Sequence, residues 1–300
     1  MTQRLPVPLA PETWLFLALG GLAVAAPAMD AWPLTGHLLV GLLAVWVALA
    51  GLPHGALDPW VAWRAGLWRG RWGWLAFNLA YVAIAATVVA VWWLAPGPAL
   101  VLFLVMSAWH FGGDWRHDLP GWARAIAGVA LLALPAWRWP TEVRDAFALL
   151  AGPDGTSIAA GLGAAAPALA VGMGAAALLA WRRSHATTLE LGAVAALAVL
   201  LPPLVYFIVY FCALHSLRHL RIAARDADAR SRWRMAGVAL LYTVLTLVAA
   251  ALAWPWLASE ASVAVPGGSL LRLVFIGLAA LTLPHMLVVM WSEHMQAVQP

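Results

Sequence analysis

Long apolar runs separated by short polar breaks make up almost the whole chain. The runs are about 15 to 25 residues long, the length of a helix that crosses a bilayer, and they mostly lack the strict alternation of a membrane β-strand. A chain in lipid has to satisfy its backbone hydrogen bonds internally. The pattern therefore predicts an all-α, polytopic membrane bundle of about ten transmembrane helices in one domain over residues 1–300. The expected helices lie near 13–29, 34–53, 73–95, 98–113, 121–137, 158–181, 188–202, 203–223, 235–254 and 269–291.

Proline, glycine and aspartate mark the breaks between these runs. The break residues are Asp30, Pro33, Pro96-Gly97-Pro98, Pro140, Pro153-Asp154-Gly155, Pro202-Pro203, Pro255 and Pro266-Gly267-Gly268. The first run could also be a signal peptide, because Arg4 precedes it and small residues end it. Glu12 interrupts its polar start, and the next run follows almost at once. We therefore expect a retained first helix.

Composition supports the membrane class. Hydrophobic residues make up 64% of the chain and charged residues only 10%, and the mean hydropathy is +0.85. A soluble domain cannot bury so much apolar surface. The basic residues, all Arg, lie mostly in short loops and not on one polar face, which excludes a nucleic-acid-binding protein.

The arginines also predict the orientation in the membrane. Alternation of ten spans puts most of them on one side, and only Arg138, Arg144 and Arg272 fall on the other. By the positive-inside rule, both termini are expected in the cytoplasm of a cell with this protein in its inner membrane. The arginines of the cytoplasmic side are Arg4, Arg64, Arg69, Arg71, Arg116, Arg182, Arg183, Arg225, Arg230, Arg232 and Arg234.

Five of the nine histidines lie inside apolar runs or at their ends. Ionisable side chains at membrane depth are costly and usually functional. In the ten-helix scheme these histidines share one depth, towards the cytoplasmic face, which predicts a common site. They are His54, His110, His215, His219 and His285, whereas His37, His117, His185 and His294 are expected in solvent.

The spacing of His215 and His219 favours a metal site. Residues four apart share a helix face, so this pair could bind one metal together with one histidine from each of two other helices. Four imidazoles would suit Fe, Zn, Cu or Ni. His285 would exceed that count, so it is expected to replace another ligand or to line a substrate cavity.

Asp58 and Asp114 each follow a histidine by four residues. They could orient metal-binding histidines of neighbouring helices. Alternatively, they could end their own helices and pair with Arg218 or Arg116.

Several functions fit such a cluster. One is another membrane-embedded histidine–metal oxidoreductase with a lipid substrate, although a di-iron desaturase would show adjacent histidine pairs. A b-type haem carrier and a transporter with a His/Asp network are further alternatives.

Four sequence blocks resemble the Brp/Blh family of membrane β-carotene 15,15′-dioxygenases. They are Pro53-His54-Gly55-Ala56-Leu57-Asp58, Trp109-His110-Phe111-Gly112-Gly113-Asp114, residues 212–219, and Pro284-His285-Met286. The resemblance implies a non-haem Fe²⁺ held by His54, His110, His215 and His219, with no catalytic residue beyond these ligands. It also implies that O₂ cleaves the central double bond of β-carotene to give two molecules of all-trans-retinal.

Overall fold

The described part of the chain is helical throughout. The computed structural model describes residues 9–26, 36–225, 227–257 and 267–298, and no strand occurs in these ranges. The elements are α1 (Pro11–Ala25), α2 (Gly36–Trp46), η2 (Val47–Gly51), α3 (Leu52–Gly55), α4 (Asp58–Arg64), α5 (Gly70–Leu94), α6 (Pro96–Gly112), η3 (Gly113–Trp115), α7 (Gly121–Arg138), α8 (Pro140–Trp181), α9 (His185–Leu200), α10 (Pro203–Ile208), η4 (Val209–Ser216), α11 (Leu217–Ala223), α12 (Ala229–Leu257) and α14 (Gly268–Val298).

Seven helical rods in the described ranges are long and apolar enough to cross a membrane. They are Gly36–Arg64, Gly70–Leu94, Pro96–Trp115, Pro140–Trp181, Pro203–Ala223, Ala229–Trp256 and Gly268–Met295. Two shorter helices, α1 and α9, are apolar as well. The all-α membrane class is thus confirmed, whereas the expected count of about ten spans is not.

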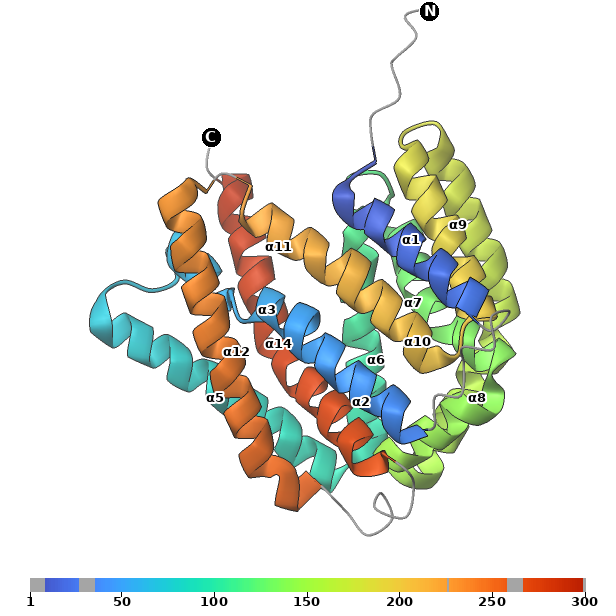
Figure 1. Ribbon diagram of the computed structural model, residues 1–300, viewed down its shortest axis with the longest axis horizontal. Helices are drawn as coiled ribbons and strands as arrows, with labels where there is room; N and C mark the ends of the chain where they lie inside the picture. The colour runs from blue at the N-terminus through green and yellow to red at the C-terminus, as the bar shows by residue number, and fades with distance from the viewer. Residues whose placement is uncertain (1–8, 27–35, 226, 258–266, 299–300) are drawn as a thin grey trace, which may run out of the picture.

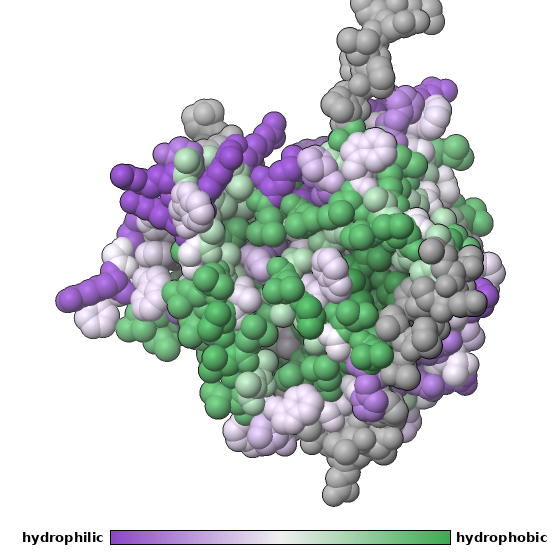
Figure 2. Space-filling model, in the orientation of Figure 1, coloured by the Kyte–Doolittle hydropathy of each residue, from purple (hydrophilic) through white to green (hydrophobic). Residues whose placement is uncertain are grey.

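The helices form two groups joined by α6 (Figure 1). Helices α7, α8 and α9 pack together, and α1 lies beside α9. Helices α5 and α12 pack against α14 in the other group. The rod from α10 through η4 to α11 crosses the front between them. Apolar side chains cover the middle of this face, and hydrophilic ones gather at the edge where α11 ends and α12 begins (Figure 2).

One expected break is wrong, and another lies just beside its expected position. Helix α8 begins at Pro140, not near residue 158, and its interruption lies at Ala151 and Gly152, just before Pro153. Gly152 has a φ of +59°, a left-handed conformation that glycine adopts without steric cost. Pro255 lies inside α12, near its end, where a missing amide donor costs only a hydrogen bond of the last turn. The breaks at Asp30 and Pro33 lie outside the described residues.

Residues 140–150 form a helix because their apolar side chains recur at helical spacing. Val143 and Leu150 are buried, and Phe147 packs between them and the neighbouring helices. The charged residues Glu142 and Arg144 lower the mean hydropathy of this segment, so hydropathy alone does not identify its short amphipathic helix.

Two of the rods contain π-helical segments directly at histidines. Segment η2 ends at Gly51, three residues before His54, and η4 contains His215. π-Helical turns are rare and occur frequently at functional sites. Helix α6, which carries His110, is fixed against α7 by close backbone contact, because a Cβ at Gly128 would collide with the carbonyl group of Ala108.

Candidate metal centre

The structure brings together the five histidines of the apolar runs. His54 lies on α3, His110 on α6, His215 on η4, His219 on α11 and His285 on α14. The ring centroids of His110 lie 4.7 Å from His215, 5.3 Å from His219 and 5.1 Å from His285. The other four, His37, His117, His185 and His294, are exposed, as expected.

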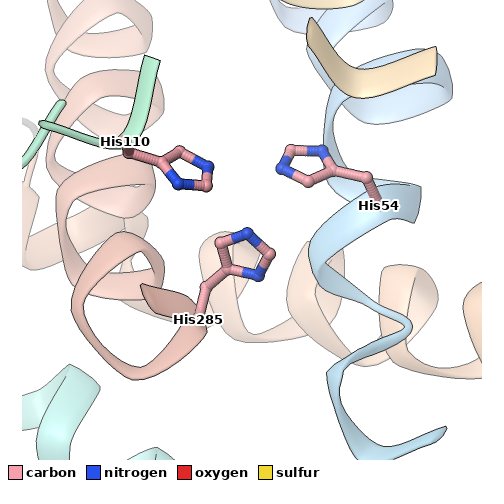
Figure 3. Close-up of side chains that lie close together, drawn as sticks. All are labelled: His54, His110 and His285. Atoms are coloured by element: carbon pink, nitrogen blue, oxygen red, sulfur yellow. The ribbon is translucent and has the colours of Figure 1, made fainter. Parts of the chain in front are cut away.

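The imidazole nitrogens form two overlapping triads. His54, His110 and His285 make one, and His110, His215 and His219 the other, with one nitrogen of each residue within 4.8 Å of those of its partners. The three rings of the first triad point towards one another from three different helices (Figure 3). Two nitrogens on one ion at about 2.1 Å each are at most about 4.2 Å apart. The Nε2 atoms of His110 and His215, 3.1 Å apart, fall within that limit.

Asp114 is buried against the second triad. Its carboxylate accepts from His215 Nδ1 at 3.1 Å and from the hydroxyl of Tyr210 at 2.8 Å. The Nε2 atom of His219 lies 3.5 Å from the same carboxylate. Because an ionised carboxylate only accepts, a neutral His215 carries its proton on Nδ1. Its Nε2 atom is then free to bind a metal.

Asp58, the first residue of α4, plays the same geometric part at the other triad. His285 Nδ1–H donates to its Oδ1 atom at 2.8 Å, and the hydroxyl of Tyr81 donates to its Oδ2 atom at 2.7 Å. Each aspartate therefore contacts a histidine of another helix. Their role at a metal stays a prediction.

His54 is oriented by the backbone. Its Nδ1 atom lies 2.5 Å from the carbonyl oxygen of Gly51, at the end of η2. This contact places the proton on Nδ1 and leaves Nε2 as an acceptor. With His215 and His285, three rings present unprotonated Nε2 atoms, which is the form that a metal binds. The residues present thus fit a metal ion.

The arginines considered as partners of the aspartates have other partners. Arg218 donates to the carboxylate of Glu190 at 2.5 Å. At Asp114 it donates to the backbone carbonyl, at 3.4 Å, and not to the carboxylate. Arg116 pairs with Glu293. Neither arginine forms a salt bridge with the carboxylate of Asp58 or Asp114 among the described residues, although Arg218 interacts electrostatically with Asp114.

A buried ion-pair network behind the histidines was missed by sequence reasoning. Glu190 on α9 accepts from Arg218, from Thr13 at 2.5 Å and from the indole of Trp115 at 3.0 Å. Glu12 lies between Arg221, at 2.7 Å, and Arg218. Glu190 is an acidic residue inside an apolar run, so the rule that identified the histidines could have identified it too.

A large apolar cavity meets the first triad. Its volume is about 910 Å³, and its walls come from α5, α6, α7, α8, α10, α12 and α14. His54, His110 and His285 are among its lining residues, and most of the others are aliphatic or aromatic. The volume lies near the upper end of the range for ligand sites, about 300–1,000 Å³.

A second, more polar cavity of about 430 Å³ reaches the histidines from elsewhere. His110 and His219 line it together with Arg116, Arg124 and Glu293. His110 is the histidine that both cavities share.

The chain is similar to known carotenoid-cleaving proteins. The family model described as beta-carotene 15,15′-dioxygenase matches residues 22–293. The beta-carotene 15,15′-dioxygenase of uncultured marine bacterium 66A03 is 30% identical over 264 residues, which cover 83% of this chain and 94% of the relative. A probable beta-carotene 15,15′-dioxygenase, Blh, of Halobacterium salinarum is 28% identical over 327 positions, covering 94% and 93%. No solved structure matches.

Proposed function

The chain belongs to the beta-carotene 15,15′-dioxygenase family, and we propose that it cleaves β-carotene at a Fe²⁺ ion held by its clustered histidines. In the net reaction, one O₂ is consumed, the central double bond breaks, and each of its carbons becomes an aldehyde carbon. Two molecules of all-trans-retinal result. The observation that carries the proposal is the convergence of intramembrane histidines on the wall of a large apolar cavity.

The residues that would hold the iron are His54, His110, His215 and His219. When bound, the iron would supply the redox chemistry that lets ground-state O₂ react with a hydrocarbon. Imidazole nitrogens suit iron. The chain's own contribution is to fix the ring orientations: the Gly51 carbonyl holds His54, and Asp114 holds His215.

The apolar cavity would bind the substrate. A polyene has no hydrogen-bonding groups, so a wall of aliphatic and aromatic side chains gives affinity by burial alone. The aromatic part of the wall includes Phe207, stacked on Phe211 with centroids 5.0 Å apart, and Phe275, 5.4 Å from Phe207. Selection of one double bond among many is then a matter of position along the cavity.

The cavity also supports access from lipid. Trp93 on α5 and Leu245 on α12 line it, and 56% and 51% of their surface is accessible, so the cavity is not closed off between these two helices. A hydrocarbon dissolved in the membrane could therefore enter sideways between α5 and α12, and retinal could leave by the same gap. We propose an inner-membrane location with cytoplasmic termini, as the arginine distribution indicates.

The test is expression in bacteria that accumulate β-carotene, followed by chromatography of the pigments. We expect β-carotene to disappear and all-trans-retinal to appear with the wild type but not with His215→Ala. Unchanged β-carotene in the presence of folded, iron-loaded protein would contradict this substrate. It would favour another lipid substrate at the same metal site.

A further inference from the structure

Two chains of three side chains converge on the cluster from opposite parts of the bundle. In one, Tyr210 donates to Asp114, and Asp114 accepts from His215 Nδ1. In the other, Tyr81 donates to Asp58 at 2.7 Å, and Asp58 accepts from His285 Nδ1 at 2.8 Å. The two chains have the same order and the same atoms. The first chain orients His215, a ligand in the proposed iron site. The second chain orients His285 in the same way, although His285 is not among the four proposed ligands.

The Nε2 atom of His285 is the nitrogen of this ring that could bind a metal. It is buried and has no hydrogen-bond partner among the described residues, and the whole residue is only 6% exposed. Asp58 keeps a proton on Nδ1, so in the neutral ring Nε2 carries an unused lone pair. A buried acceptor without a partner costs about 1–3 kcal/mol. A metal ion at this atom would remove that cost.

The surroundings of His285 leave this nitrogen no other evident use. The ring centroids of His54 and His110 both lie 5.1 Å from that of His285, and the three residues form one of the two triads of possible ligands. His285 also lines the apolar cavity, whereas neither His215 nor His219 does. His285 therefore stands between the proposed metal position and the space for the polyene.

Resting on the proposed function, we infer that His285 is a fifth imidazole ligand of the same metal ion, on its substrate side, and that Asp58 and Tyr81 are positioning residues that act through it. Asp58 fixes the tautomer and the ring plane of His285. Tyr81 lies on α5, and its hydroxyl donates a hydrogen bond that fixes the carboxylate of Asp58. The second chain thus holds a ligand in the way that the first chain does.

Tyr81→Phe gives the sharpest test, because it removes one oxygen atom and leaves the packing almost unchanged. The matched control is Tyr206→Phe. Tyr206 also lines the cavity, but its hydroxyl donates to the backbone carbonyl of Leu131 at 3.2 Å. Full-length protein in detergent is titrated with Fe²⁺ against a competing chelator. We expect about 10-fold weaker binding in Tyr81→Phe and about 10- to 100-fold weaker binding in Asp58→Asn, with Tyr206→Phe equal to the wild type.

Spectroscopy provides the second measurement. Co²⁺ is bound in place of iron at saturating concentration, and its visible absorption, which responds to the number of nitrogen ligands, is compared between the wild type and His285→Ala. We expect a changed spectrum. An unchanged Co²⁺ spectrum in His285→Ala, or wild-type Fe²⁺ affinity in both Tyr81→Phe and Asp58→Asn, would overturn the inference.

Failure of the inference differs from failure of the proposed function. If the wild type binds no iron, or if His110→Ala keeps full iron affinity, the proposed metal site itself is wrong. If His110→Ala and His215→Ala lose iron while the His285, Asp58 and Tyr81 variants do not, only the role of the second chain is wrong. A merely structural role of Tyr81 would lower thermal stability and leave metal affinity unchanged.

Discussion

The Nε2 atoms of His110 and His215 lie 3.1 Å apart, although the two residues are 105 positions apart in the chain. Two imidazole nitrogens at this distance share either one proton or one ion. The proposed site assigns them one ion.

Loss of either of these two rings should remove the metal. We expect His110→Ala and His215→Ala to lower iron affinity by at least about 100-fold, more than the loss of a supporting side chain would, and to abolish retinal formation. His117→Ala, which changes an exposed histidine, serves as the control. Iron content of purified protein and pigment chromatography are the measurements, and full iron content in either variant would remove that residue from the site.

Asp114→Asn should weaken metal binding without removing a ligand. The amide can present a donor where the carboxylate accepts, so His215 loses the partner that sets its tautomer. Iron affinity should fall roughly 10- to 100-fold, measured by chelator competition. The exposed Asp154 offers Asp154→Asn as a control that keeps wild-type affinity. Equal affinities of the two variants would mean that Asp114 only packs in the interior.

Bulk added to the cavity should affect the substrate and not the metal. Ala250 lines the apolar cavity, and its neighbour Ala251 on the same helix does not. Overpacking costs about 1–3 kcal/mol, so Ala250→Phe should lower kcat/KM for β-carotene about tenfold or more, with iron content unchanged. Ala251→Phe should keep the wild-type kcat/KM. Equal kinetics in the two variants would place the substrate elsewhere.

The buried ion-pair network should matter for stability. Glu190→Ala leaves the guanidinium group of Arg218 without its closest carboxylate, a change that costs about 3–5 kcal/mol at buried pairs. Glu293→Ala breaks the exposed pair with Arg116 and should cost less than about 1 kcal/mol. Thermal unfolding in detergent measures both. A similar Tm for the two variants would show that solvent or lipid headgroups screen Glu190.

The positions of the histidines and the contacts of Asp58 and Asp114 with histidines of other helices were predictable, whereas the tyrosines that hold the aspartates were not. An ionisable residue in an apolar run is rare, and it can be recognised from the sequence alone. This applies to His54, His110, His215, His219 and His285. Tyr81 carries no such signal. Its pairing with Asp58 depends on how α5 packs beside α4, and a tyrosine in a membrane helix is ordinary by composition.

The fold class was predictable for the same reason, and the span count was not. Hydropathy identifies apolar runs, but it does not show where a helix is interrupted or whether each piece is long enough to cross a membrane. Helix α8 shows the difficulty, because an amphipathic helical piece at 140–150 precedes the interruption at Ala151 and Gly152, and the apolar helix follows it. The break beside Pro153 was predictable from turn chemistry, whereas the helix at 140–150 was not, because packing stabilises it.

The positions of the histidines depend on the number of residues in the π-helical segments. In η4, residues Val209–Ser216 wind more widely than an α-helix, so that His215 and His219 reach the cluster from a rod whose start is fixed at Pro203. Deleting one residue there would leave every ligand present in the sequence but would let the wide turn close to an α-helix, which shifts His215 relative to the start of the helix at Pro203. A change of chain length within these segments therefore displaces the ligands even though the composition of the helix stays almost unchanged.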